Sequence, residues 1–127
     1  KYILVERKNN ICQGVSLSRA SQKNAFNSEV AELNPPAYNY HHLWQCVREV
    51  RIQAKGWETF FHNRGIMPFR VVYEDLVKDR ARFMLRALEY LGIDIPPDFQ
   101  TPEPSLKKQA DSLSDEWVEK FQRGDLD

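Results

Sequence analysis

The feature that most constrains the fold is a short apolar run that passes almost directly into a helical segment. Tyr2–Val5 is continuously apolar, which is typical of a parallel strand covered on both faces. Asn9–Lys23 is then predicted to be a helix that either Asn9 or Asn10 caps. Arg7 lies at the carboxyl end of the strand, and Ser16 lies about two turns into the helix. Because ligands of open α/β sheets bind beyond the carboxyl ends of strands, these two residue types predict a phosphate site there.

The other elements follow from apolar periodicity and from helix terminators. A long helix is predicted over about His41–Asn63 and is ended by Gly65. A second strand is predicted over Met67–Tyr73, as a parallel neighbour or near neighbour of the first in one sheet, and a helix over about Val77–Leu91. A last helix is expected to start at a Ser114 cap. This order of strands and helices predicts a parallel α/β layer, although two strands are too few for a complete sheet.

Three local features carry more detailed expectations. Gly14 costs about 1 kcal/mol in a helix relative to Ala, so we expect a neighbour or ligand close to its backbone. Asn27–Tyr40 is expected to be a long loop, in which Tyr38 and Tyr40 either pack or contact a sugar. The apolar positions of the long helix form one stripe that is expected to face the core: Leu43, Val47, Val50, Ala54, Trp57 and Phe61.

Composition limits the class of protein. The 127 residues are 42% apolar and 28% charged with a net charge of zero, which fits at most one domain and gives no indication of nucleic-acid binding. No apolar run approaches the roughly 18 residues of a membrane span. Cys12 and Cys46 lack zinc spacing and are predicted to be reduced thiols of a cytoplasmic protein. No signal peptide is visible. Because the first residue is Lys rather than Met and the first strand starts without a lead-in, we expect a fragment or truncated reading frame of a longer protein.

Three segments carry a family resemblance by their order and spacing. They read ERKNNICQGVSLSRASQ, GWETFFHNRGIMPFRVVYEDLVKDRARFMLRALEYLGI and LKKQADSLSDEWVEKF. Together they resemble the carboxyl half of the bacterial trehalose 2-sulfotransferase-like family, also called the lipopolysaccharide sulfotransferase-like family. The resemblance implies an α/β fold, an incomplete three-layer P-loop-like sulfotransferase fold with a short parallel sheet flanked by helices. Residues 1–127 would be the carboxyl-terminal part of a single domain, without its amino-terminal phosphosulfate loop.

The same resemblance implies a reaction and a cosubstrate. A sulfuryl group would pass from 3′-phosphoadenosine 5′-phosphosulfate (PAPS) to a hydroxyl, on a carbohydrate or glycolipid acceptor. In such enzymes an Arg at the strand end and a Ser on the next helix hold the 3′-phosphate, and Arg7 and Ser16 occupy these places. Lys8 stands eight residues before Ser16, so either Arg7 or Lys8 could be the direct ligand. The further candidates for binding the nucleotide are Arg19, Lys107 and Lys108.

The resemblance also implies what this chain does not supply. The glycine-rich loop and the general base would lie upstream of Lys1, so no catalytic residue and no metal ligand are expected, and the chain alone should be inactive. His41 and His42, being adjacent in a helix, favour a helix-start or packing role over metal binding or general-base catalysis. Glu74 and Asp75 favour turn and cap roles over acid–base catalysis. An exposed apolar sheet edge would be prone to association, so formation of a homodimer is possible.

Other interpretations of the same residues stay open at this point. Arg7 by itself is typical of a surface salt-bridge residue, and Ser16 of a helix surface. The chain could belong to a nucleotide kinase or another phosphate-loop protein. It could also be a non-catalytic interaction module, which predicts a large exposed apolar patch along Leu43, Val47 and Val50.

Overall fold

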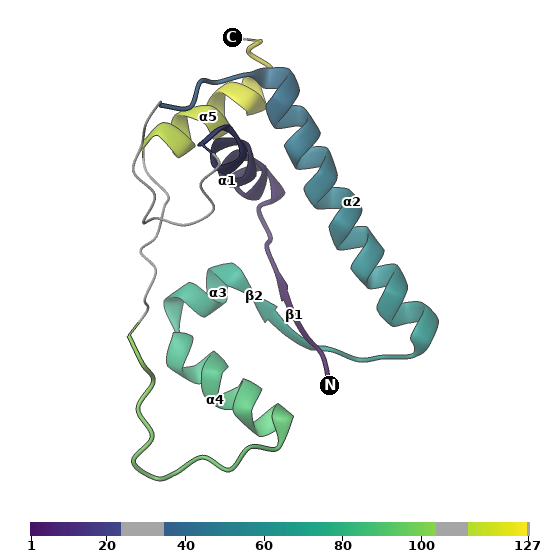
Figure 1. Cartoon of the computed structure of the whole chain (residues 1–127), viewed down its shortest axis with the longest axis vertical. Helices are drawn as coiled ribbons and strands as arrows, with labels where there is room; N and C mark the ends of the chain where they lie inside the picture. The colour runs from purple at the N-terminus through teal and green to yellow at the C-terminus, as the bar shows by residue number, and fades with distance from the viewer. Residues whose placement is uncertain (24–34, 104–111, 127) are drawn as a thin grey trace. The chain divides into compact units, whose positions relative to one another are not determined.

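The chain forms two short strands and five helices in the residues that its computed structural model describes, 1–23, 35–103 and 112–126 (Figure 1). The amino-terminal elements are β1 (Ile3–Glu6) and α1 (Asn10–Lys23). The long helix α2 (Tyr40–Arg64) leads through a turn at Gly65 to β2 (Phe69–Val72). Three further helices follow: α3 (Tyr73–Lys78), α4 (Arg80–Leu91) and α5 (Ser112–Arg123).

The contacts among these elements divide the chain into two compact units. The first unit comprises Lys1–Lys8 and Ala54–Glu103, and so contains both strands with α3 and α4. The second unit comprises Asn9–Gln53 and residues 104–127, and so contains α1 and α5. Helix α2 contributes its amino-terminal part to the second unit and its carboxyl-terminal part to the first.

The first unit is built on a parallel pair of strands. β1 pairs with β2 in a register that runs from Ile3 opposite Phe69 to Glu6 opposite Val72. The prediction that the two strands are parallel neighbours in one sheet is therefore confirmed. Helix α4 packs against this pair through Tyr90, whose ring stacks on that of Phe69 at a centroid distance of 5.5 Å.

The helix predicted over Val77–Leu91 is wrong as one continuous element, because the chain breaks at Asp79 between α3 and α4. The Asp79 side chain accepts a hydrogen bond from the backbone N–H of Arg82 at 3.1 Å, which caps α4. Gly92 ends α4 as expected. It has a φ of 76°, and its N–H donates to the carbonyl of Glu89 at 2.9 Å.

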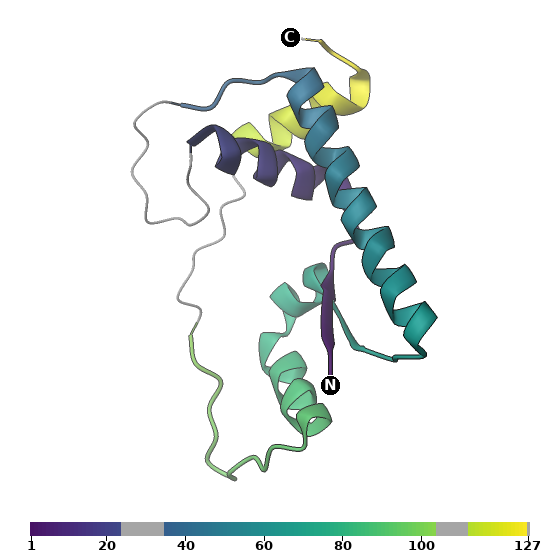
Figure 2. The same ribbon diagram turned by 45° about the vertical axis from the view of Figure 1, so that its right-hand side comes forward.

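The core of the second unit is a cluster of Val15, Leu43, Val47 and Trp117, each at most 2% exposed. Both ribbon views show α1 and α5 lying alongside each other (Figure 2). Gly14 allows α1 to approach α2 closely, because a Cβ there would overlap Cγ2 of Val47 and lie 3.1 Å from its backbone nitrogen. The expected close approach at Gly14 is confirmed.

The apolar stripe of α2 is buried only at its two ends. Leu43, Val47, Val50 and Phe61 are buried, whereas Ala54 is exposed and Trp57 is 50% exposed. The expectation of a continuous core stripe is wrong in the middle of the helix, where no described element covers residues 54 and 57. No helix within the described ranges combines the length and the apolar character needed to cross a membrane.

Helix α5 begins two residues before the predicted start at Ser114. Its first residue is Ser112, which places Ser114 within the first turn of the helix. The predicted cap was therefore wrong, and the Ser114 hydroxyl instead accepts a hydrogen bond from Arg19 of α1. The apolar face of α5 is as predicted, with Trp117 buried and with Val118 and Phe121 against the core.

Candidate functional site

The carboxyl ends of β1 and β2 bring the predicted cationic residues against the start of α3. Continuing the strand register by one residue sets Arg7 opposite Tyr73, and by two residues sets Lys8 opposite Glu74. The side chains and backbone follow this register. Cζ of Arg7 lies 3.9 Å from the centroid of the Tyr73 ring, and the backbone N–H of Lys8 donates to Oε2 of Glu74 at 3.1 Å.

Lys8 is held by carboxylates of α3. Its Nζ lies 3.4 Å from Oδ2 of Asp75, whose other carboxylate oxygen lies 3.9 Å from Nζ of Lys78. The pair is exposed, so it contributes little to folding stability. The ion pair nevertheless occupies the ammonium group of Lys8, with which a bound anion would have to interact. Glu74 and Asp75 thus bind the Lys8 segment, rather than facing each other as an acid–base pair.

Arg7 differs from Lys8 because its charged group contacts an aromatic ring instead of a carboxylate. The guanidinium is half-buried on the face of the Tyr73 ring, and within residues 1–23, 35–103 and 112–126 no carboxylate lies at salt-bridge distance from it. The alternative of Arg7 as a surface salt-bridge residue therefore has no ion pair in the described part of the chain to support it. The planar fork of N–H donors keeps the geometry that matches phosphate oxygens.

Ser16 and Arg19 lie on α1 in the second unit. Ser16 is exposed, and its hydroxyl donates to the carbonyl of Cys12 one turn earlier at 3.1 Å. Such a bond to the helix backbone can be exchanged for a bond to an incoming anion, because the hydroxyl rotates about a single bond. Nη1 of Arg19 donates to the Ser114 hydroxyl at 2.5 Å, and so joins α1 to α5. Asn9 caps α1 as predicted, accepting from the backbone N–H groups of Ile11 and Cys12.

The structure thus places the candidate residues in two groups. Arg7 and Lys8 belong to the first unit, and Ser16 and Arg19 belong to the second. Their convergence on one anion stays a prediction. Lys107 and Lys108 lie outside the described residues. Tyr73 was not predicted from the sequence. Once the strand pairing is known, however, counting one residue beyond Glu6 and one beyond Val72 identifies Tyr73 as the neighbour of Arg7.

A Ser–His–Cys cluster in the second unit has the residue types of a nucleophilic site but is packed in the interior. Oγ of Ser18 lies 2.9 Å from Nδ1 of His42, and Nε2 of His42 lies 4.0 Å from Sγ of Cys46. Ser18 is fully buried, and burial raises the pKa of the Cys46 thiol against an opposing hydrogen bond from Ser18. Neither Ser18 nor Cys46 is therefore an accessible nucleophile, and the predicted packing role of His42 is confirmed.

The tyrosines considered for sugar contact pack within the second unit. The Tyr38 hydroxyl donates to the carbonyl of Asp125 at 2.9 Å, and its ring meets Trp117 edge-on at 5.6 Å. The ring of Tyr40 stacks on Phe121 at 5.2 Å. The packing alternative therefore describes both residues, and most of the Asn27–Tyr40 loop lies outside the described residues.

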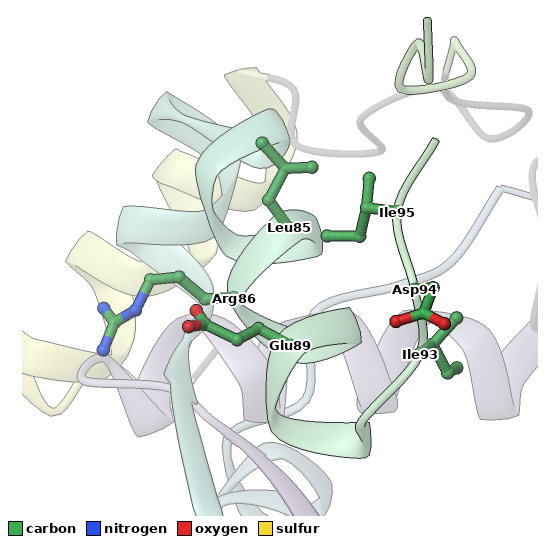
Figure 3. A pocket seen from close by; sticks show the side chains of 6 residues that line it. All are labelled: Leu85, Arg86, Glu89, Ile93, Asp94 and Ile95. Carbon is green, nitrogen blue, oxygen red and sulfur yellow. The ribbon is translucent and has the colours of Figure 1, made fainter. Parts of the chain in front are cut away.

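An open hollow of about 410 Å³ lies between α4 and the segment that follows it. Figure 3 shows Leu85 and Ile95 pointing toward each other, whereas Arg86 and Glu89 extend away on the other side of α4. Polar groups do not converge there. No cluster of three or more metal-ligating side chains occurs in the described part of the chain.

Comparisons with known proteins identify the family of the chain. The model of the Stf0 sulphotransferase family matches residues 1–124. A trehalose 2-sulfotransferase of Mycolicibacterium smegmatis is 31% identical over 123 residues, which cover 95% of this chain and 45% of that protein. A trehalose 2-sulfotransferase of Mycobacterium tuberculosis is 29% identical over 122 residues, covering 94% and 45% respectively. The chain thus spans somewhat less than half the length of these relatives.

The family match covers β1, the Arg7–Lys8 segment and all five helices, so it includes every residue that the sequence singled out as a nucleotide ligand. The small α/β unit with a parallel pair of strands is consistent with a sulfotransferase fold. The chain belongs to the Stf0 sulphotransferase family.

Proposed function

We propose that this chain forms part of the PAPS site of a sulfotransferase that acts on a hydroxyl of a carbohydrate or glycolipid. Membership of the Stf0 family supports sulfuryl transfer, and the two relatives named as trehalose 2-sulfotransferases support a carbohydrate acceptor. Cys12 and Cys46 are free thiols, and action in the reducing cytoplasm is part of the same proposal.

The observation that carries the proposal is the position of Arg7 and the contact that its guanidinium makes. Its guanidinium follows β1, where ligands of α/β sheets bind, and it faces an aromatic ring rather than a carboxylate. Among the described residues no carboxylate pairs with its N–H edge, and a permanently charged group in this situation suits a dianionic phosphate. Lys8 is the weaker candidate, because Asp75 already neutralises its ammonium.

The proposed chemistry assigns binding, not bond making, to this chain. The acceptor oxygen attacks sulfur, the bond from sulfur to the phosphate oxygen of the donor breaks, and a base takes the hydroxyl proton. Arg7 and Ser16 would hold the 3′-phosphate throughout, with Arg19, Lys107 and Lys108 as further candidates. Such transfer depends mainly on positioning and on stabilising the charge of the leaving phosphate.

The test is the affinity of the native protein for adenosine 3′,5′-bisphosphate, measured by calorimetry. Arg7→Ala should weaken binding by about 1.5–3 kcal/mol, the contribution of a hydrogen bond to a charged group. This corresponds to roughly 10-fold to 150-fold in the dissociation constant.

Two variants serve as comparisons. Arg82→Ala removes an exposed cation of α4 in the same unit and should leave the affinity unchanged. Lys8→Ala should weaken binding less than Arg7→Ala. If Arg7→Ala binds the bisphosphate as tightly as the unmodified protein, the proposed site is wrong.

A further inference from the structure

We propose that Tyr73 is a positioning residue that acts through Arg7. Its ring fixes the plane of the guanidinium so that the N–H edge is directed at the 3′-phosphate of the cosubstrate. This inference rests on the proposed function, since it assigns a purpose to a neighbour of the proposed phosphate ligand. It concerns the face of the tyrosine ring, and requires no contact between the tyrosine hydroxyl and the nucleotide.

The fold places the two side chains together through the strand pairing. β1 and β2 end at the same level, with Glu6 opposite Val72, so the next residues of the two strands are neighbours. Tyr73 is also the first residue of α3, and it is half-buried there. The backbone from which the ring extends therefore lies beside the carboxyl end of β1, and Cζ of Arg7 lies 3.9 Å from the ring centroid.

The bond between Lys8 and Glu74 fixes the backbone next to this contact. The Lys8 N–H donates to the Glu74 carboxylate, and the Lys8 ammonium pairs with Asp75. The first turn of α3 thus holds the chain on the carboxyl side of Arg7 by two further contacts. With the backbone held, the ring needs to orient only the side chain of Arg7.

A guanidinium can interact through its face and its edge at the same time. The face packs on an aromatic ring, whereas the five N–H donors lie in the plane and point outward. A ring partner consequently leaves the donors to a phosphate, which a carboxylate partner would occupy. Arg70 of β2 shows the contrasting case, because its edge is taken by Glu58 at 2.6 and 2.8 Å and by Glu6 at 3.2 Å.

Contact with a ring does not by itself mark a site in this chain. Cζ of Arg64 lies 4.2 Å from the ring centroid of Phe60, but on the exposed last turn of α2. Arg7 differs because it combines the ring contact with a place at the carboxyl end of β1, where no described carboxylate pairs with it. It is this combination that assigns Tyr73 its role.

The experiment compares two tyrosine variants for binding of adenosine 3′,5′-bisphosphate to the native protein. Tyr73→Leu removes the ring and should weaken binding by about 2-fold to 30-fold, the range equivalent to a cation–π contact. Tyr73→Phe keeps the ring and should bind as the unmodified protein does. In sulfuryl-transfer assays Tyr73→Leu should raise KM for the donor more than it lowers kcat.

Two controls separate positioning from a structural effect. Adenosine 5′-monophosphate, which lacks the 3′-phosphate, should bind Tyr73→Leu and the unmodified protein equally. In an Arg7→Ala background the further change of Tyr73→Leu should have no effect, because the group that the ring positions is gone. Should Tyr73→Leu fail to fold, Tyr73→Met fills a similar volume without a ring and carries the same expectation.

The outcomes distinguish this inference from the function on which it rests. A loss of bisphosphate affinity in Arg7→Ala, with none in Tyr73→Leu, overturns the positioning role and leaves the proposed phosphate site in place. Equal losses in Tyr73→Phe and Tyr73→Leu also overturn it, because the hydroxyl would then make the contact. If Arg7→Ala loses no bisphosphate affinity, the proposed function itself is wrong.

Discussion

Gly14 is the residue at which helix propensity and packing oppose each other most directly. An alanine there would favour the helix by about 1 kcal/mol in an open position. The site is not open, because the added Cβ would overlap Val47 Cγ2 and come within 3.1 Å of the Val47 backbone. Backbone atoms cannot move aside as a side-chain tip can, so α1 and α2 would have to separate.

We therefore predict that Gly14→Ala destabilises the protein by about 1–3 kcal/mol, the cost of overpacking a well-filled interior. Gly56→Ala is the matched control, since Gly56 lies within α2 and a Cβ there would meet nothing within 4 Å. That variant should be neutral or more stable by up to about 1 kcal/mol. Urea denaturation measures both, and equal effects of the two substitutions would contradict the packing argument.

At the residue scale, the sequence predicted where single residues lie within the elements better than it predicted which side chains contact each other. Arg7 at a strand end, the Asn9 cap and the close approach at Gly14 follow from chain position and residue type, and the last two are confirmed. Tyr73 as the neighbour of Arg7 depends on the pairing of strands distant in sequence, which the pattern of either strand alone does not contain. Trp57 was misplaced because periodicity describes a helix face and not what covers it.

Among the elements, the break between α3 and α4 has a local chemical cause. Asp79 accepts a hydrogen bond from the backbone N–H of Arg82, and its own N–H donates to the carbonyl of Asp75. The residue thus ends one helix and starts the next. A continuous helical pattern over Val77–Leu91 does not show this break, because apolar periodicity describes the buried face of a helix and not the residue at which the helix begins.

We predict that Asp79→Ala destabilises the protein by about 1 kcal/mol, the usual cost of losing a helix cap. Asp79→Asn keeps an acceptor oxygen in the same place and should retain most of the stability. Chemical denaturation monitored by circular dichroism provides the measurement. A larger loss in Asp79→Asn than in Asp79→Ala would show that the cap bond is not the reason for the break.

At the scale of the whole molecule, the parallel pairing and the α/β class were predicted from the sequence and are confirmed, whereas the predicted order of elements lacked the separate short helix α3. The exposed patch that an interaction module would require along Leu43, Val47 and Val50 is absent, since all three side chains are buried. The division into two units was not predicted. Helix α2 contributes to both units, which a single apolar stripe in the sequence does not indicate.

We predict that the 127-residue polypeptide alone does not transfer a sulfuryl group from PAPS to any sugar above the rate without protein. Its five glycines are scattered through the sequence and form no phosphate loop, and the chain covers 45% of its sulfotransferase relatives. The loss of one preorganised anion donor commonly lowers a rate by about 10²- to 10³-fold. Radiolabelled PAPS provides the assay, and labelled sugar above background would contradict the prediction.

The strand register also determines where the chain can tolerate a change of length. Arg7 and Tyr73 are joined across the β1–β2 pair, so residues inserted in the turn after α2 would leave them opposite each other. One residue inserted inside β2 would instead move Tyr73 out of register and reverse the faces of the side chains beyond it. Diversity of length in this family should therefore concentrate outside the two four-residue strands, whose register sets Arg7 of the proposed anion site beside Tyr73.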